Sequence, residues 1–338
     1  MAKLFSIQYL RAFAALGVVV FHAQGLTHGP ELIIGSAGVD VFFVVSGFVM
    51  WTVTAHRSTQ TPAGFLLNRI IRIVPMYWFV TLSFVFAAVT FPALFPRQVV
   101  SIDHTLASLF FVPMRSPSNG GIWPVVVPGW TLNCEMFFYA IFALALALFL
   151  EDTKRLIFLA AVFFALILAG RVYTGSSPPI IFFTDPTMLE FPSGILLGRA
   201  FQQDRLPRLR WGYISLAVGL LLFLVSARLD IGSPRIVVWG IPAFLLVAGA
   251  VIIEDKRNVP VVPALAVLGD ASYSIYLTHT LTISAIEKFK AHFSPASLFV
   301  ASLLLSALVG VAAWRLFERP FAEFLKPGPG VQRPHLAG

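Results

Sequence analysis

The chain has 338 residues, of which 58% are hydrophobic and only 12% are charged, and its formal net charge is +8. This composition is typical of a membrane protein and excludes a chain made of soluble globular domains. It also excludes a nucleic-acid-binding protein, because the basic residues are scattered between apolar runs and form no basic domain.

Apolar stretches of roughly 17 to 22 residues recur along nearly the whole sequence. They predict a single all-α integral membrane bundle, with one polytopic domain over 1–325 and a flexible tail over 326–338. The stretch at 187–201 is short and contains Glu190 and Pro192, so a broken or re-entrant segment is the alternative there. The ten predicted transmembrane helices are 5–24, 36–55, 75–95, 130–150, 155–171, 187–201, 211–227, 236–253, 267–286 and 296–317.

The distribution of basic residues predicts the orientation of this bundle. With both termini in the cytoplasm, about 16 of the Lys and Arg residues face the cytoplasm and about 7 face the other side, as the positive-inside rule requires. A cleaved signal peptide is the alternative for residues 1–24, since Lys3 precedes an apolar run. Arg11 within that run and His22 near its end disfavour this alternative.

The first predicted helix carries an arginine and a histidine eleven residues apart, Arg11 and His22. At this spacing they fall within roughly 20° on one helix face and about 16 Å apart along the axis. A charge in the bilayer costs at least about 2.5 kcal/mol, so Arg11 must meet a partner, water or an anion, or extend to the headgroups. An arginine toward the cytoplasm and a histidine toward the far side would suit a long, thin substrate with a phosphate at one end and its reacting carbon at the other. An acyl-coenzyme A has that shape.

A second pair of arginines, Arg69 and Arg72, lies one helical turn apart beside the third predicted span. Their guanidinium groups could bind the phosphates of an acyl donor from the cytoplasm, or they could simply anchor the helix on that side. The sequence contains no Walker A motif, no convincing dinucleotide fingerprint and no HExxH motif, and its histidines show no metal-ligand spacing. The single cysteine, Cys134, allows no disulfide framework, so we expect neither a metal nor a permanently bound cofactor.

Six blocks along the chain resemble the motifs of the membrane acyltransferase type 3 family, bacterial enzymes that acylate cell-surface and secreted glycans. The resemblance covers essentially the whole chain, and the form of the block at 129–139 resembles the exopolysaccharide-acetylating, ExoZ-type branch. Many O-antigen acetylases of the family have paired glutamates where this chain has Asn133, Cys134 and Glu135. The blocks are the Arg11 to His22 spacing, GVDVFFVVSGFVM (38–50), NRIIRIVP (68–75), GWTLNCEMFFY (129–139), GDASYSIYLTH (269–279) and FERPF (317–321).

The resemblance implies a catalytic role for His22, as the general base that deprotonates a sugar hydroxyl or as a transient acyl carrier. Glu135 would fix the tautomer of that histidine, with a structural interhelical hydrogen bond as the alternative. Arg11, Arg69 and Arg72 would bind the donor, Arg11 at a phosphate or at the pantetheine entrance. The chain ends soon after FERPF without the extra hydrolase-like domain of some members, so transfer would occur in this bundle or in a separate protein.

Other polar residues are predicted to reach the same non-cytoplasmic depth as His22 and to contact substrate or support the site. Asp40 and Asn133 begin predicted helices there, and an acid at a helix start can also simply face water. Tyr276 and His279 share a helical face with Ser272, and this polar stripe could line the acceptor path or serve only bundle packing.

The sequence therefore predicts a bacterial inner-membrane O-acyltransferase. We expect it to move an acyl group, in the first instance acetyl, from cytoplasmic acyl-CoA to a hydroxyl of an exopolysaccharide or another surface glycan. Its expected partners are acyl-CoA, a lipid-linked or polymeric glycan and membrane lipids, with no nucleic acid. A non-enzymatic transporter or flippase is the alternative, in which the buried polar residues would line a solute path; it would predict inverted repeats, and no convincing internal repeat is found.

Overall fold

A computed structural model describes residues 4–26, 33–55, 61–228 and 234–325, so the predicted tail over 326–338 lies outside the described residues. Over these ranges the protein is all-α and contains no β-strand, which confirms the predicted fold class. Eight helices or joined helical segments are long and apolar enough to cross a membrane. The α-helices are α1 (Phe5–Ala23), α2 (Gly38–Ala55), α3 (Pro62–Thr90), α4 (Ile102–Leu109), α5 (Trp130–Leu148), α6 (Asp152–Val172), α7 (Pro178–Phe183), α8 (Glu190–Gln202), α9 (Leu209–Ser226), α10 (Ile241–Lys256), α11 (Pro263–Asp270), α12 (Ser272–Glu287), α13 (Pro295–Ala313) and α14 (Arg319–Leu325).

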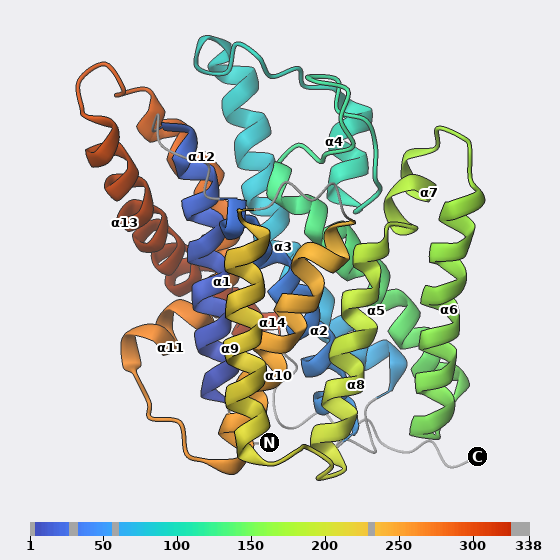
Figure 1. The fold of residues 1–338 in the computed structure, drawn as a ribbon. Helices are drawn as coiled ribbons and strands as arrows, with labels where there is room; N and C mark the ends of the chain where they lie inside the picture. Colours follow the sequence, from blue (N-terminus) through green and yellow to red (C-terminus); the bar gives the residue numbers. More distant parts are fainter. Residues whose placement is uncertain (1–3, 27–32, 56–60, 229–233, 326–338) are drawn as a thin grey trace.

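The helices form one bundle whose interior holds the polar residues of interest. Figure 1 shows most of the long helices running in roughly the same direction, with α13 at one edge, α6 at the other, and α4 at one end of the bundle. Helix α12 packs against both α1 and α13, and α2 packs against α1, α8 and α10. The central helices α1, α2, α5 and α12 therefore surround the middle of the protein.

Two of the ten predicted spans form helices shorter than a full membrane crossing. The stretch predicted at 187–201 is the 13-residue helix α8, and the stretch predicted at 267–286 is divided between α11 and α12. Neither is among the eight candidate spans. At about 1.5 Å per residue, helix α8 covers roughly 20 Å, less than the hydrocarbon core of a bilayer. Helix α8 is instead covered by protein, because it packs along most of the length of α2.

Close packing between α2 and α8 depends on two glycines, one on each helix, each of which faces the backbone of the opposite helix. A Cβ added at Gly47 would overlap the carbonyl oxygen of Phe191, and one added at Gly194 would overlap the carbonyl oxygen of Val44. Small residues at helix contacts let backbones approach closely, which is a common way to associate helices in a membrane. These glycines therefore fix the position of α2, which carries Ser46 and Asp40 into the interior.

Helix α3 begins earlier than the sequence analysis predicts. We expected a span from residue 75, but α3 begins at Pro62 and continues through Pro75, so Arg69 and Arg72 lie within the helix rather than before it. An internal proline removes one backbone hydrogen bond, and neighbouring polar groups make this tolerable in membrane helices. Near the proline, the Tyr273 hydroxyl of α12 donates to the Ile73 carbonyl oxygen at 2.8 Å, which ties α12 to α3 at this point.

The start of α1 is held by a carboxylate from the end of α10. Both backbone amides at the helix start, Phe5 N and Ser6 N, donate to Glu254 at 2.7 and 2.8 Å, and the Ser6 hydroxyl donates to Glu254 as well. A negative charge at a helix N-terminus accepts hydrogen bonds that the helix cannot satisfy and is favoured by the helix dipole. This contact fixes the axial position of α1 and thereby the depths of Arg11 and His22.

Candidate functional site

A cavity of about 110 Å³ lies inside the bundle between α1, α2, α3, α5 and α12. Its wall is mostly apolar on the α2 side, with Ser46 as the exception, and carries most of its polar side chains on α1, α3, α5 and α12. The lining residues are Arg11, Val39, Phe42, Phe43, Val45, Ser46, Val49, Met50, Arg69, Arg72, Ile73, Thr131, Leu132, Glu135, Tyr139, Ser272, Tyr273 and Tyr276.

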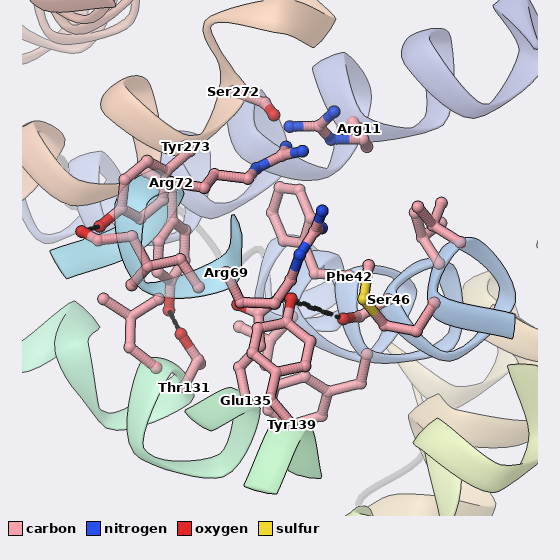
Figure 2. A pocket seen from close by; sticks show the side chains of 18 residues that line it. Arg11, Phe42, Ser46, Arg69, Arg72, Thr131, Glu135, Tyr139, Ser272 and Tyr273 are labelled. Atoms are coloured by element: carbon pink, nitrogen blue, oxygen red, sulfur yellow. Dashed lines mark hydrogen bonds between the residues drawn. The ribbon is translucent and has the colours of Figure 1, made fainter. Parts of the chain in front are cut away.

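Three arginines from two helices converge on this cavity. Figure 2 shows Arg11 of α1 and Arg72 of α3 extending toward each other, with Ser272 of α12 beside them and Arg69 pointing into the space between. Arg11 and Arg72 repel each other electrostatically. The Nε atom of Arg69 is buried and has no hydrogen-bond partner among the described residues. Like charges placed together around an open space, with an unused buried donor, form a site suited to an anionic ligand.

Glu135 lies on the opposite wall of the cavity and is held by two hydroxyl groups. The Tyr139 hydroxyl donates a short hydrogen bond to its carboxylate, and the Ser46 hydroxyl donates to the same oxygen at 3.0 Å. Arg69 interacts electrostatically with both Tyr139 and Glu135. The sequence analysis expected Glu135 to orient His22, but the structure places its carboxylate against these hydroxyl groups and Arg69. The physical reason is that Tyr139 follows Glu135 by one helical turn and reaches it first.

A second carboxylate, from the turn between α13 and α14, lies near the arginines. Glu318 of the FERPF block accepts a hydrogen bond from the Ser274 hydroxyl at 2.5 Å and interacts electrostatically with Arg72 and Arg11. It is carried by a π-helical turn, η7 (Trp314–Glu318), that links α13 to α14. Such turns occur often at functional sites because they redirect a side chain within a helix. The arginine cluster therefore has carboxylates on two sides.

His22 lies outside the cavity wall, paired with His279. The Nε2 atom of His279 is 3.2 Å from the Nδ1 atom of His22, and the two rings meet edge to face with centroids 4.8 Å apart. The Nδ1 atom of His22 also lies 3.0 Å from the Val18 carbonyl oxygen. The two histidines come from α1 and α12, which are 257 residues apart in sequence at this contact. The bundle therefore brings together two predicted site residues that the sequence could place only at a similar depth.

Tyr276 stands between the cavity and the histidine pair. Its side chain lines the cavity and accepts a hydrogen bond from the Thr131 hydroxyl at 3.2 Å. Its ring also packs against His279, with centroids 5.8 Å apart. Arg11, near the start of α1, thus lines the cavity, whereas His22, near the end of the same helix, lies beyond Tyr276 and outside the cavity wall. Of the predicted stripe, Ser272 and Tyr276 line the cavity, whereas His279 lies against His22.

Asp40 and Asn133 lie outside the cavity wall. Asp40 is fully buried and forms an ion pair with Arg235, with bonds of 2.6 and 3.1 Å, while Arg235 also donates to the Ser36 carbonyl oxygen. Asn133 is buried in the first turn of α5, and its side-chain oxygen has no hydrogen-bond partner among the described residues. Asp40 thus joins α2 to the segment before α10. Neither residue contacts the arginine cluster or the histidine pair through a hydrogen bond in the described ranges.

Sequence analysis gave no role to several residues of this site. Tyr139 could have been found from its spacing of four from Glu135, and Glu318 from the FERPF block. No comparable signal marks Ser46, because a serine in an apolar helix is more often a packing residue. Within the described ranges, no group of three or more His, Cys, Asp and Glu residues could hold a metal ion.

Comparison with known proteins supports the reading of the sequence blocks. The model of a family described as an acyltransferase domain matches residues 4–315. The exopolysaccharide production protein ExoZ of Rhizobium meliloti (strain 1021) is 43% identical over 314 residues, which cover 89% of this chain and 94% of that protein. The O-acetyltransferase OatA of Staphylococcus aureus (strain NCTC 8325 / PS 47) is 24% identical over 364 residues, covering 95% of this chain and 58% of OatA. No solved structure matches the chain.

The family match spans nearly all of the described bundle, including α1, α3, α5 and α12, which build the cavity. ExoZ matches over almost its whole length, so the likeness extends to the complete arrangement of helices rather than to one motif. The chain is therefore a multi-pass membrane acyltransferase and belongs to the membrane acyltransferase type 3 family, in its ExoZ-type branch.

Proposed function

We propose that this protein is an O-acyltransferase of the bacterial inner membrane that uses acyl-CoA, in the first instance acetyl-CoA, as its donor. The acceptor is a hydroxyl group of an exopolysaccharide or another surface glycan, and both termini lie in the cytoplasm. The names of two relatives, the exopolysaccharide production protein ExoZ and the O-acetyltransferase OatA, support an acetyl group and an exopolysaccharide acceptor. The observation that carries the proposal is the cluster of Arg11, Arg69 and Arg72 around one cavity.

The arginine cluster suits the phosphates of coenzyme A. Arg72 is exposed, whereas Arg11 and Arg69 are half-buried, so the cluster runs from an accessible position into the bundle. The cavity has a volume of about 110 Å³, which is smaller than the 300–1,000 Å³ of typical ligand pockets. The narrow pantetheine arm would therefore enter the cavity, and the nucleotide would remain outside against Arg72.

In this proposal, the thioester of the donor meets the acceptor hydroxyl at the histidine pair. His22 takes the proton of a sugar hydroxyl as the hydroxyl oxygen attacks the thioester carbonyl carbon. The new C–O bond forms, the C–S bond breaks, and the coenzyme A thiolate leaves with the proton that His22 releases. His22 as a transient acyl carrier would use the same ring nitrogen and give the same products. Because Tyr276 separates the cavity from the pair, the donor reaches His22 only when this side chain moves.

The experiment uses purified full-length protein in lipid nanodiscs with acetyl-CoA and a deacetylated exopolysaccharide oligosaccharide. Release of free coenzyme A is followed with a thiol reagent, and mass spectrometry identifies the acetylated product. We expect coenzyme A release and glycan acetylation in equal amounts. A transporter or flippase would cleave no thioester, so a folded protein that releases no coenzyme A under these conditions would refute the proposal.

Arginine variants test the donor site directly. Arg69→Ala and Arg72→Ala each remove a charge-assisted interaction of about 1.5–3 kcal/mol, which corresponds to a roughly 10- to 150-fold weaker apparent affinity for acetyl-CoA. Lys154→Ala is the matched control, since Lys154 is an exposed cation near the start of α6 that forms an ion pair with Glu151 and does not line the cavity. Unchanged donor affinity in both arginine variants would contradict the phosphate-binding role.

A histidine variant separates chemistry from binding. His22→Ala should lower turnover by about 10²- to 10⁴-fold, the usual contribution of a general base, while coenzyme A binding stays near the wild-type value. Binding is measured by titration calorimetry with coenzyme A, and turnover by product formation. Wild-type rates of glycan acetylation in this variant would eliminate the catalytic assignment.

A further inference from the structure

The hydrogen bonds around the histidine pair assign the proton on each ring nitrogen. His279 Nδ1 lies 2.5 Å from the backbone carbonyl oxygen of Tyr276, and a carbonyl oxygen can only accept. His279 Nδ1 therefore carries a hydrogen and donates it. In the neutral imidazole the other nitrogen, Nε2, then has a free lone pair and acts as an acceptor.

The hydrogen-bond partners of His22 likewise show which of its ring nitrogens carries the hydrogen. His22 Nδ1 lies 3.2 Å from the Nε2 acceptor of His279 and 3.0 Å from the carbonyl oxygen of Val18. Both neighbours are acceptors, so the hydrogen of His22 is on Nδ1 and is shared between them. The Nε2 atom of His22 is then left with its lone pair. This nitrogen has the protonation state that a general base or a nucleophile requires.

We propose that His279 is a positioning residue for His22: its neutral ring accepts the His22 Nδ1 hydrogen and thereby keeps the His22 Nε2 lone pair toward the reacting hydroxyl. The proposal rests on the proposed function, in which His22 is the catalytic histidine. His279 thus takes the place that a carboxylate has in a catalytic triad. Glu135, the carboxylate that the sequence suggested for that place, forms its hydrogen bonds with Tyr139 and Ser46.

A neutral acceptor differs from a carboxylate in its effect on catalysis. A carboxylate both fixes the tautomer and stabilises the imidazolium that forms in the reaction, whereas a neutral imidazole can only fix tautomer and ring orientation. His279 is fully buried on α12, and no described carboxylate is hydrogen-bonded to either ring. The pair therefore enters and leaves the catalytic cycle without net charge, which suits a site enclosed by apolar helices because a buried unpaired charge is costly.

The expected fall in kcat when His279 is replaced depends on the second acceptor of the His22 hydrogen, the Val18 carbonyl oxygen. Val18 would still hold the Nδ1 hydrogen of His22 if His279 were replaced, so loss of His279 weakens the preference without abolishing it. In a serine protease, in which a single carboxylate sets the tautomer, its replacement by an amide lowers kcat by about 10⁴-fold. With Val18 retained, we expect His279→Leu to lower kcat by about 10- to 100-fold, with the KM for acetyl-CoA unchanged.

The test combines two variants with a direct reading of the tautomer. His279→Gln supplies a side-chain oxygen that can accept from His22 and should recover kcat to within a few-fold of wild type, whereas His279→Leu should not. Coenzyme A affinity and thermal midpoint should match wild type in both, which separates positioning from a packing defect. Wild-type kcat in His279→Leu would overturn the proposal, and so would a loss that His279→Gln fails to recover in a protein that still folds and binds coenzyme A.

Nitrogen NMR of histidine-labelled protein reads the proton position without any substrate, and His22→Ala identifies the His22 signals. We expect a protonated Nδ1 and an unprotonated Nε2 on His22 in the wild type, with a mixture of tautomers in His279→Leu. A wild-type His22 that is protonated on Nε2 would overturn the proposal even if neither variant folds. A correct tautomer in a protein that cleaves no thioester would instead show that the proposed function fails while the hydrogen-bond assignment stands.

Discussion

The ion pair between Asp40 and Arg235 predicts a loss of stability rather than of catalysis when its acid is neutralised. Asp40 is fully buried and receives two hydrogen bonds from the guanidinium group, which also donates to the Ser36 carbonyl oxygen. This contact links α2 to the start of the segment that leads into α10. It lies outside the wall of the arginine cavity. Asp40→Asn should therefore weaken the fold and leave the chemistry of the folded protein intact.

The magnitude follows from the exposure of the two partners. Breaking a buried ion pair usually costs about 3–5 kcal/mol, because the remaining charge is left without a partner. The Arg235 side chain retains 33% exposure and can recover some hydration, and Glu190, which lies beside Asp40, supplies another carboxyl group. We therefore expect a cost of about 2–3 kcal/mol, below the usual range. For a chain of 338 residues that corresponds to a fall in the thermal midpoint of roughly 3–4 °C.

The assay measures thermal midpoint in detergent together with kcat and the KM for acetyl-CoA at a temperature at which all variants are folded. Asp40→Asn combined with Arg235→Gln should recover most of the lost stability, since the double variant leaves no unpaired charge. The control is Glu151→Gln, which removes an exposed ion pair with Lys154 and should cost less than about 1 kcal/mol. A stable Asp40→Asn protein with strongly reduced kcat would refute this reasoning and return Asp40 to the catalytic or acceptor site.

Three further variants test the packing of the helices around the site. Gly47→Ala places a Cβ against the backbone of α8 and should lower stability by about 1–3 kcal/mol in a thermal melt, whereas Gly25→Ala, which has open space around it, should change stability by less than about 0.5 kcal/mol. Glu254→Ala removes the acceptor of the first two amides of α1 and should lower the thermal midpoint by an amount equivalent to about 1–2 kcal/mol; an unchanged melt would show that the cap is not used. Tyr276→Ala opens the way between the cavity and the histidine pair and should raise the ratio of free acetate to glycan ester, measured by mass spectrometry, whereas Tyr276→Phe keeps the ring and should leave this ratio at the wild-type value.

The sequence predicted the fold class because the lengths of apolar runs determine which segments can cross a bilayer. It misplaced the start of α3, since a proline that would end a helix in water is accommodated at Pro75 inside the bundle. It marked the stretch at 187–201 as short, with a broken or re-entrant segment as the alternative, but it could not show which helix covers that stretch. The length of an apolar run says nothing about whether a neighbour covers it, and α8 is covered by α2.

Candidate site residues were easier to predict than their partners. Helical periodicity gives the face and depth of each side chain, which was enough to place Arg11 and His22 at different depths of α1. Periodicity does not say which helix faces that side. The sequence therefore predicted one depth for Asp40, Glu135 and the histidines but could not predict which of them contact one another, and the structure divides them into three separate groups.

This division has a physical origin in the costs of burial. Each polar group in the interior needs a partner, and the partner found is the nearest one that the bundle supplies, whatever its distance in sequence. Asp40 finds Arg235, 195 residues away, and Glu135 finds Tyr139, 4 residues away. What remains after these pairings is the more informative set: Arg69 with an unpaired buried nitrogen, and a histidine pair whose hydrogen bonds leave one ring nitrogen of His22 unprotonated. Several other buried polar atoms also lack a hydrogen-bond partner among the described residues, but of these atoms only those of Arg69 and Ser272 belong to residues that line the cavity, where a substrate would meet them.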